Sequence, residues 1–518
     1  MDEKSSFITI EENKRLSESK LWELQEKAYT QYGPEAWADK GVPFYITSSP
    51  YTAKKYASVV LGYVRDVIRN KQLHPEKPIY IFDLGAGSGR FGYLFVQFFL
   101  KAIRQLYGNK LQFKYVMTDL VQENIESWKK HELLQSFINE GVMDFALYKH
   151  DQSASLELAI SGENLTKLVN PAVIIGNYFF DTIPQDFFRV KAGCLEEGRV
   201  SLQTENHEIA QDDPAIIEHL VSTCVYTPII DPGSYYPNDP DLNAVLLDYM
   251  QNVDELPLPF PLGAFQSIKY FDKLAEGRLL VLVGDQGVAT EGQMLELNEP
   301  RIDKHGTFSM PVSYHSIKKY FDMRGGVGYL TTFSDPTFVV LAGVLGGDHI
   351  YSRETAFAFE ENIDRFEPKD YWHLIEASEE QMKEYSIEHI LYLLKLGYWD
   401  PVNFHSFFLH IHGKIADAPS WIKSELPLIV DELYRQFFPI SKEEVGFIIN
   451  LGVVCFEVKD YAKALDYFER AHSFAGDDPL VYRNISACHA KMGNTLEAFR
   501  YLDIAKKLEE NSSSESEM

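Results

Sequence analysis

Residues 79–92 read Ile79-Tyr80-Ile81-Phe82-Asp83-Leu84-Gly85-Ala86-Gly87-Ser88-Gly89-Arg90-Phe91-Gly92. A run of strand-forming residues ends at an acid and passes into a turn that holds four glycines in eight positions. From Phe91 onward, apolar residues recur at helical spacing. A strand, a glycine turn and a helix in this order form the first unit of a doubly wound α/β sheet, which binds ligands at the carboxyl ends of its strands. The stretch therefore predicts an α/β fold with a ligand site at the turn.

The glycine turn fits two classes of cofactor. Gly87-x-Gly89-x-x-Gly92 matches the dinucleotide pattern, in which glycines let the backbone approach a pyrophosphate. An acid followed by three alternating glycines, here Asp83, Gly85, Gly87 and Gly89, is the turn of S-adenosylmethionine (SAM) methyltransferases. If the turn began at Gly87, Asp83 would be buried in the strand without a partner, which is energetically costly. This argument favours SAM over NAD.

A second acid supports the SAM interpretation. Residues 113–119 read as the next strand, and this strand ends at Asp119. One carboxylate would meet the ammonium of SAM, the other would meet its ribose, and bare backbone would meet its amino-acid end. The predicted cofactor-binding residues of these two segments are Asp83, Gly85, Ala86, Gly87, Gly89, Asp119 and Leu120.

Two other segments are candidates for cofactor contacts, each with a structural alternative. Asp151 follows the predicted strand 143–151 and could accept a hydrogen bond from the adenine amino group, or it could cap the next helix. Thr47 and Ser48 precede a predicted helix, about 53–71. They could belong to an N-terminal lid over the cofactor, or they could simply form the helix N-cap. Residues 7–40 are predicted to be helical.

The tips of two later strands carry the candidate catalytic residues. A buried strand, 172–176, runs into Asn177, Tyr178 and, three residues later, Asp181. An amide, a ring and a carboxylate beside the sulfonium suit a substrate nitrogen, and Asn177 is also a candidate cofactor contact. In the alternative interpretation, Asn177 and Asp181 satisfy loop backbone and cap a helix. Asp285, after the strand 278–284, is a further carboxylate at this edge.

Composition narrows the class of protein. The chain has 518 residues and a net charge of −27, which argues against nucleic acid as the main partner and is compatible with a basic protein substrate. The four cysteines are scattered without a CxxC pair, and His405, His410 and His412 do not share a helical face, so no metal site is expected. No membrane span and no signal peptide are recognised, so a cytoplasmic location is expected. The oligomeric state is not predicted.

The chain is too long for one core, and its texture changes along its length. Asn450, Leu451, Ala464 and Ala471 recur 34 positions later as Asn484, Ile485, Ala498 and Ala505, the period of a tetratricopeptide repeat. The predicted parts are an N-terminal helical cap or lid (1–74), a seven-stranded doubly wound methyltransferase domain (75–350) with a substrate-side insertion (205–262), a helical region (351–440), tetratricopeptide-like repeats (441–510) and a disordered tail (511–518).

These motifs together resemble the MidA family of SAM-dependent methyltransferases, whose mitochondrial members methylate an arginine of a respiratory-complex subunit. The similarity covers roughly residues 40–345. It rests on Phe44-x-x-Thr47-Ser48-x-Pro50, Asp83-Leu84-Gly85-Ala86-Gly87-Ser88-Gly89, Asn177-x-x-Phe180-Asp181-x-x-Pro184 and Asp285-x-Gly287. The chain departs from the family pattern at Tyr178, where an acid is usual, at Gln286, where a tyrosine is usual, and in its repeat-like C-terminal part.

The resemblance implies a SAM-dependent methyltransferase that acts on a nitrogen, such as that of arginine, in a protein recruited by the helical repeats. Two alternatives stay open from the sequence. The enzyme could methylate a small molecule, with the repeats mediating oligomerisation. The chain could also be an adaptor that binds a protein or peptide partner through its repeats and does not turn over.

Overall fold

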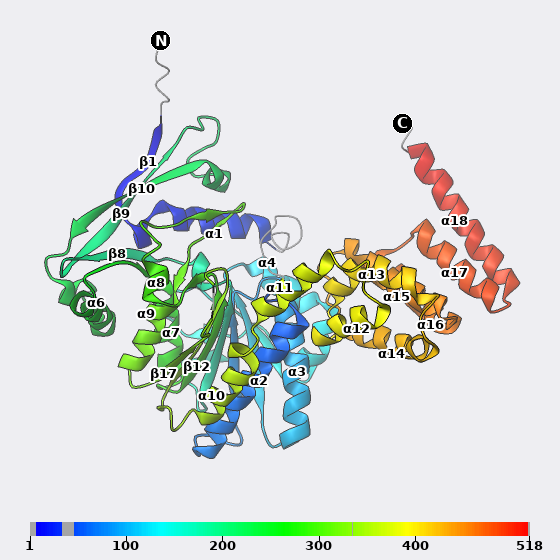
Figure 1. The fold of residues 1–518 in the computed structure, drawn as a ribbon, viewed down its shortest axis with the longest axis horizontal. Helices are drawn as coiled ribbons and strands as arrows, with labels where there is room; N and C mark the ends of the chain where they lie inside the picture. The colour runs from blue at the N-terminus through cyan, green and yellow to red at the C-terminus, as the bar shows by residue number, and fades with distance from the viewer. Residues whose placement is uncertain (1–6, 34–45, 334, 516–518) are drawn as a thin grey trace, which may run out of the picture. The chain divides into compact units, whose positions relative to one another are not determined.

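The computed structural model describes residues 7–33, 46–333 and 335–515, and it is drawn in Figure 1. The chain groups into two compact units. The first comprises Met1–Ser48 and Thr52–Lys369, and the second comprises Ser49–Tyr51 and Asp370–Met518.

A seven-stranded sheet forms the centre of the first unit, with the strand order β17-β18-β12-β7-β2-β3-β4. The strands are β2 (Ile79–Leu84), β3 (Phe113–Asp119), β4 (Met143–Leu147), β7 (Ala172–Asn177), β12 (Leu279–Asp285), β17 (Val327–Leu330) and β18 (Val339–Leu345). The five strands from β4 to β12 are parallel, and β18 is antiparallel to both of its neighbours. The predicted seven-stranded α/β sheet is confirmed, as a mixed sheet.

Helices cover both faces of this sheet because its strands are apolar on both sides. Phe82 of β2 packs on Phe271 of α7, with ring centroids 4.7 Å apart, whereas Tyr115 of β3 packs on Phe95 of α3 at 5.2 Å. The helices of this unit are α1 (Lys20–Tyr32), α2 (Pro50–Arg69, whose first two residues group with the second unit), α3 (Arg90–Tyr107), α4 (Gln122–Lys130), α5 (Gln135–Asn139), α6 (Pro240–Asn252), α7 (Leu262–Leu274), α8 (Glu291–Met294), α9 (Tyr314–Met323) and α10 (Arg353–Phe359).

The strand order determines where a ligand site is expected. From β2 the chain continues to β3 and β4 on one side, and it then returns to β7 on the other side of β2. In open α/β sheets the crevice for ligands lies at the carboxyl ends of the strands where this reversal occurs. The turn after β2 and the segment after β7 therefore flank the expected site.

A second sheet of five antiparallel strands belongs to the same unit. Its order is β1-β9-β8-β11, and β10 also pairs with β9. The strands are β1 (Ile8–Arg15), β8 (Asp186–Lys191), β9 (Cys194–Thr204), β10 (Leu220–Pro228) and β11 (Glu255–Phe260). The predicted insertion 205–262 thus supplies two strands of this sheet. Three two-stranded ribbons complete the unit: β5 (Leu156–Glu157) with β6 (Asn164–Leu165), β13 (Gly287–Val288) with β16 (Val312–Ser313), and β14 (Asp303–Lys304) with β15 (Phe308–Ser309).

The N-terminal segment differs from the sequence prediction. Residues 7–40 were expected to be helical, but Ile8–Arg15 forms strand β1 and only Lys20–Tyr32 forms a helix, α1. β1 pairs with β9, which is distant in sequence: Ile8 lies opposite Thr204, 196 residues further along the chain. The apolar face of β1 is short and its second half is polar, so its own sequence shows little strand pattern. The pairing with β9 cannot be read from nearby residues. The predicted helical cap is therefore part strand and part helix.

The second unit is helical. Its helices are α11 (Pro368–Glu379, which begins at the unit boundary), α12 (Ile387–Leu396), α13 (Pro401–Ile415), α14 (Ser420–Gln436), α15 (Val445–Glu457), α16 (Tyr461–Ala475), α17 (Pro479–Lys491) and α18 (Thr495–Glu515). Consecutive helices pack as pairs, α15 on α16 and α17 on α18. The repeated positions Leu451, Ala464, Ala471, Ile485 and Ala505 are buried. The helical character is as predicted, while the assignment to tetratricopeptide repeats stays a prediction.

The C-terminal end also differs from expectation. Residues 511–518 were expected to form a disordered tail, but α18 continues through Glu515. Extending an existing helix by a few residues costs little once its first turns are packed, even where the composition is polar.

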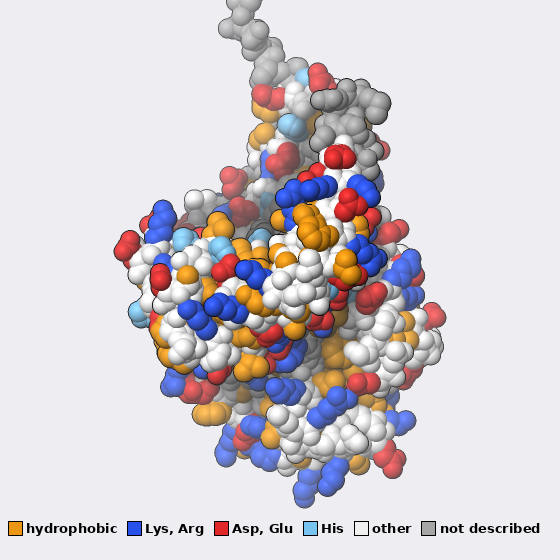
Figure 2. Space-filling model, turned by 90° about the vertical axis from the view of Figure 1, so that its right-hand side faces the viewer, with side chains coloured by type: hydrophobic (Ala, Val, Ile, Leu, Met, Phe, Trp, Pro, Cys, Tyr) orange, Lys and Arg blue, Asp and Glu red, His pale blue; other side chains and the backbone are white. Residues whose placement is uncertain are grey.

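Among the described helices, none combines the length and the apolar character that a membrane span requires. On the face shown in Figure 2, positive and negative side chains are interspersed.

Candidate functional site

The turn after β2 requires glycine at alternate positions. Gly85, Gly87 and Gly89 have φ angles of +64°, +55° and +81°, a region that side chains disfavour. A Cβ atom on Gly85 would also lie 2.8 Å from the ring of Phe179, which follows β7. The turn can therefore pack closely against the segment after β7 only because position 85 has no side chain.

Asp83 lies at the base of this turn and has a partner in the structure. Its Oδ2 accepts a hydrogen bond of 2.8 Å from the hydroxyl of Tyr115, on β3. Burial raises the pKa of Asp83 to about 7, although the Tyr115 hydroxyl opposes this shift. Ala86 N–H donates to the carbonyl of Thr118 at 2.9 Å and fixes the turn to β3.

Asp119, at the tip of β3, organises the backbone around it. Its Oδ2 accepts the N–H of Gly87 at 3.2 Å, and its Oδ1 accepts the N–H of Val121 at 3.0 Å. The indole Nε1 of Trp128 donates to the carbonyl of Gly87 at 3.0 Å. Burial raises the pKa of Asp119 above its usual value. The N–H of Gly87, which a pyrophosphate would need, already donates to the Asp119 carboxylate. This turn is therefore unsuited to a dinucleotide phosphate.

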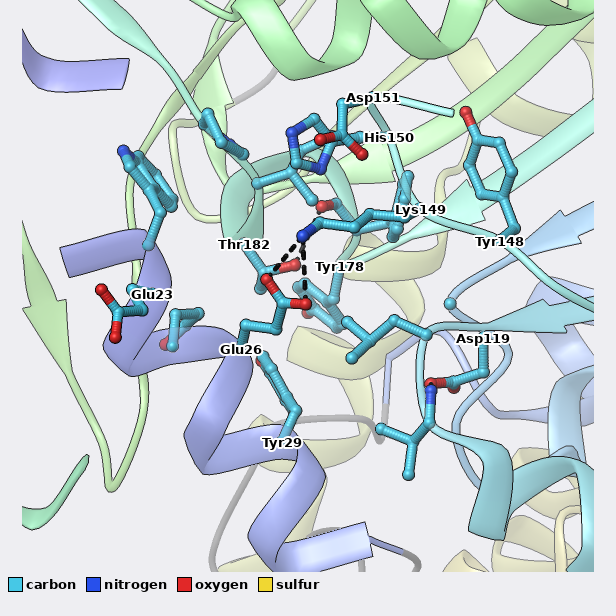
Figure 3. Close-up of a pocket in the computed structure, with 18 of the residues that line it drawn as sticks. Glu23, Glu26, Tyr29, Asp119, Tyr148, Lys149, His150, Asp151, Tyr178 and Thr182 are labelled. Atoms are coloured by element: carbon cyan, nitrogen blue, oxygen red, sulfur yellow. Dashed lines mark hydrogen bonds and ion pairs between the residues drawn. The ribbon is translucent and has the colours of Figure 1, made fainter. Parts of the chain in front are cut away.

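A cavity of about 330 Å³ opens at these strand tips, and Figure 3 shows most of its lining. Its walls come from the turn after β2, the segments after β3, β4 and β7, and helix α1. The lining residues are Ser17, Trp22, Glu23, Gln25, Glu26, Tyr29, Gly33, Gly85, Asp119, Leu120, Val121, Asn124, Tyr148, Lys149, His150, Asp151, Tyr178, Phe179, Thr182, Ile183 and Pro184. The cavity therefore lies at the edge where the strand order places a ligand site.

Helix α1 closes one side of the cavity. In Figure 3, Glu26 of α1 faces Lys149, and the Lys149 ammonium lies 2.7 and 3.0 Å from the two carboxylate oxygens of Glu26. Tyr29, one turn further along α1, is partly buried, and its desolvation together with the nearby Asp181 carboxylate raises its pKa. The N-terminal segment is thus part of the site.

The lining of the cavity combines acidic and aromatic side chains, a combination that suits a cationic ligand. Lys149 is paired with Glu26, and burial lowers the pKa of His150, which favours its neutral form. Four lining residues are acidic: Glu23 is paired with Lys27, Glu26 is paired with Lys149, and Asp119 and Asp151 have no ion pair among the described residues. Five are aromatic, and aromatic faces attract cations: Trp22, Tyr29, Tyr148, Tyr178 and Phe179.

A pair of buried carboxyl groups lies beside the cavity wall. Asp285 Oδ2, at the tip of β12, accepts the backbone N–H groups of Phe179, Phe180 and Asp181 at 3.0, 2.9 and 3.4 Å. Oδ1 of Asp181 and Oδ1 of Asp285 are buried without a hydrogen-bond partner among the described residues, and each carboxyl group perturbs the titration of the other. Burial and the neighbouring carboxylate raise the pKa of Asp285 well above its usual range, and burial raises the pKa of Asp181 to about 7. The two groups therefore share a proton near neutral pH.

Several polar groups around this pair lack a partner among the described residues. Both amide atoms of Asn177, at the tip of β7, are buried without a hydrogen bond, and so are the hydroxyls of Tyr56 and Tyr314. Tyr178 has a φ of +51°, which is uncommon for a residue with a side chain. Unsatisfied buried groups and strained backbone are rare, and both are concentrated at functional sites.

Comparisons with known proteins were made by family, by sequence and by structure. No family model matches the chain, and no curated protein sequence matches it. One similar solved structure is a Burkholderia thailandensis protein bound to S-adenosyl-homocysteine, at 13% identity over 63% of this chain and 93% of that chain, with a TM-score of 0.37. A second is an uncharacterized protein from the same organism, at 10% identity over 63% of this chain and 93% of that chain, with a TM-score of 0.34. A third is magnesium protoporphyrin IX methyltransferase from Synechocystis with bound S-adenosyl-homocysteine, at 10% identity over 62% of this chain and 97% of that chain, with a TM-score of 0.27.

The structure divides the sequence-predicted residues into four groups. The cavity is lined by Gly85, Asp119, Leu120, Asp151 and Tyr178. The supporting turn holds Asp83, Ala86, Gly87 and Gly89. The buried cluster at the tips of β7 and β12 holds Asn177, Asp181 and Asp285. Thr47 and Ser48 precede α2 and do not belong to the cavity lining, and Phe44 and Tyr45 lie outside the described residues.

Sequence reasoning missed part of the site. Trp22, Glu26 and Tyr29 of α1 were not singled out, nor were Tyr56 of α2 and Tyr314 of α9. Each belongs to an ordinary amphipathic helix, so no local pattern distinguishes it from a core or surface residue. Only the packing of these helices against the strand tips shows that these side chains belong to the site.

The raised pKa of Asp83 predicts a pH-dependent stability. A carboxyl group whose folded pKa lies above its unfolded value contributes stability that is complete below about pH 4 and is lost as the pH rises through 7. We therefore expect Asp83→Asn to match the wild type near pH 4 and to exceed its free energy of unfolding by about 2–4 kcal/mol at pH 8. Urea denaturation at both pH values measures this difference. A variant that is less stable at pH 8 would show that Asp83 is ionised in the folded chain.

Proposed function

We propose that this chain is a SAM-dependent methyltransferase. The observation that carries the proposal is the cavity at the strand-order reversal, where the bare backbone of Gly85 and the carboxylate of Asp119 meet an acidic and aromatic lining. SAM has a positive sulfonium, an ammonium and an adenine ring, and this lining offers carboxylates and aromatic faces to such groups. A dinucleotide would bring a pyrophosphate instead, and Asp119 already occupies the N–H of Gly87.

The residues present fit the cofactor in named roles. Asp119 and Leu120 would hold the ribose, Asp151 the adenine amino group, and Asp83 with the glycine turn the amino-acid end. SAM supplies an electrophilic methyl group. The chain would supply the positioning that makes an in-line displacement fast.

The cluster beside the cavity would handle the acceptor. The unpartnered amide of Asn177 can accept a hydrogen bond from an acceptor N–H, and the ring of Tyr178 lines the cavity next to it. Asp181 would take the proton that the acceptor nitrogen releases. Near neutral pH the Asp181–Asp285 pair holds one proton, and Asp181 can still bind another. Asp285 would hold the loop that carries Asp181.

The acceptor class and the cellular context are finer parts of the proposal. The resemblance to the MidA family favours a protein nitrogen, including that of arginine, while Tyr178 in place of an acid leaves one carboxylate fewer for a guanidinium. We further propose that the second, helical unit binds the protein or peptide partner and that the enzyme acts in the cytoplasm. The alternatives are a small-molecule acceptor and a non-catalytic adaptor.

A pair of glycine substitutions tests the cofactor site. Gly85→Ala places a Cβ against Phe179 at the cavity, whereas Gly141→Ala places a Cβ at a similarly positive φ (+73° against +64°) with no atom within 4 Å. Backbone strain should cost each variant about 1 kcal/mol of stability, and Gly85→Ala should lose more because its Cβ also clashes with Phe179. We expect only Gly85→Ala to weaken SAM binding by more than about tenfold in isothermal titration. Equal SAM affinities for the two variants would contradict the assignment.

A further inference from the structure

Strand β10 lies at an edge of the five-stranded sheet. It pairs with β9 over nine consecutive residue pairs, from Leu220 opposite Thr204 to Pro228 opposite Glu196, without a bulge. No other strand among the described residues pairs with it. Edge strands are usually protected by charges, prolines or bulges, but β10 has no charged residue, and its one proline is at its last position.

The pairing pattern identifies the backbone groups that face away from β9. Ile229 N–H donates to the carbonyl of Leu195 at 2.9 Å, which marks these residues as a hydrogen-bonded pair. Such pairs alternate along an antiparallel ladder. The N–H and C=O groups of Ser222, Cys224 and Tyr226 therefore point outward. No hydrogen bond to them occurs within the described part of the chain.

The outer face of this edge is apolar. The segments before and after β10, within residues 205–235, carry exposed acids and are called the acidic rim. Val221 and Val225 of the outer face are 47% and 60% exposed. Arg199, opposite Val225 on β9, is paired with Glu197 at 3.1 Å. Residues 205–235 contain no Lys or Arg, and their acids are all exposed: Glu205, Glu208, Asp212, Asp213, Glu218 and Asp231. The first residue of the strand is covered by Lys304, whose ammonium donates to the carbonyl of Leu220.

We propose that β10 binds an extended, basic segment of a partner protein as an additional strand of the sheet. In this mode of recognition, main-chain hydrogen bonds provide affinity for any extended chain. The acidic rim provides the selection, since a segment with Lys or Arg at its ends gains attraction and an acidic segment is repelled. The proposal does not depend on the methyltransferase assignment, because no residue of β10 lines the cavity.

A proline substitution tests the edge directly. Ser222→Pro removes an outward N–H and leaves the inward ladder to β9 intact, while Ser222→Ala removes only the hydroxyl. The probe is a fluorescein-labelled peptide, KVKVTVKVK, titrated with the full chain in fluorescence anisotropy. We expect Ser222→Pro to weaken binding at least tenfold, Ser222→Ala to leave it unchanged, and affinity to fall between about 50 and 300 mM NaCl.

Three results would overturn the proposal. The first is equal binding of the peptide by Ser222→Pro and the wild type. The second is equal or tighter binding of the peptide in which glutamate replaces each lysine. The third is a chain that does not bind the peptide but self-associates in sedimentation, with Ser222→Pro abolishing the self-association. The occupant of the edge would then be a second copy of the chain. Thermal unfolding of Ser222→Pro at the wild-type temperature confirms that the edge, and not the fold, has changed.

Discussion

Asp285→Ala is expected to be the most destabilising substitution in the site. The Asp285 carboxylate accepts three backbone N–H groups from the segment after β7, and it is fully buried. A buried donor left without an acceptor costs about 1–3 kcal/mol. We therefore expect the free energy of unfolding to fall by about 3–5 kcal/mol in urea denaturation, with an unchanged dependence on denaturant.

Asp285→Asn is the matched control for this prediction. The amide oxygen of asparagine can still accept the three N–H groups, while the second acid of the pair is removed. We expect this variant to lose less than about 1.5 kcal/mol at pH 7. If the two variants lose the same amount, the carboxylate does not hold the loop through these hydrogen bonds.

Asn177→Ala should reduce activity with no loss of stability. Both amide atoms of Asn177 are buried without a partner among the described residues, so removing them relieves an unfavourable burial. We expect the free energy of unfolding to stay within about 0.5 kcal/mol of the wild type or to rise. Transfer of tritiated methyl from SAM into total cell protein should fall about 10²-fold, because the amide would orient the acceptor nitrogen.

Asn170→Ala gives the opposite result if this interpretation is right. The Asn170 amide is fully bonded: Oδ1 accepts the N–H of His74 at 2.6 Å, and Nδ2 donates to the carbonyls of His74 and Lys77 at 3.1 and 2.6 Å. Its removal should cost about 2–4 kcal/mol and leave methyl transfer per folded molecule unchanged. A large loss of stability in Asn177→Ala would mean that its amide has a structural role.

The parts of the fold that depend on local pattern could be predicted from the sequence. The strand and turn from Ile79 to Gly89 combine a run of isoleucine and aromatic residues, an acid and alternating glycines, and each of these signals is contained in a few residues. The same holds for Asp119 and Asn177, because both directly follow apolar strands. The predicted residues at four strand tips therefore lie at one edge of the sheet.

The parts that depend on distant pairing could not be predicted. Strand β1 was expected to be helical from its local, mixed polarity, which gives no sign of its partner β9, 184 to 196 residues further along the chain. For the same reason, the contribution of α1 to the cavity was missed, since Glu26 meets Lys149 only through tertiary packing. Asp285 was recognised as a carboxylate at the ligand edge, but its three bonds to the segment after β7 depend on the parallel pairing of β12 with β7.

The measurement that tests the central claim most directly is isothermal titration of the full chain with SAM and, separately, with NAD. The account predicts one site for SAM, with a Kd on the order of 10 µM, and no heat from NAD. Binding of NAD without binding of SAM would contradict it, because the turn at Gly87 would then accommodate a pyrophosphate beside Asp119. Absence of SAM binding would contradict the methyltransferase assignment and favour the adaptor.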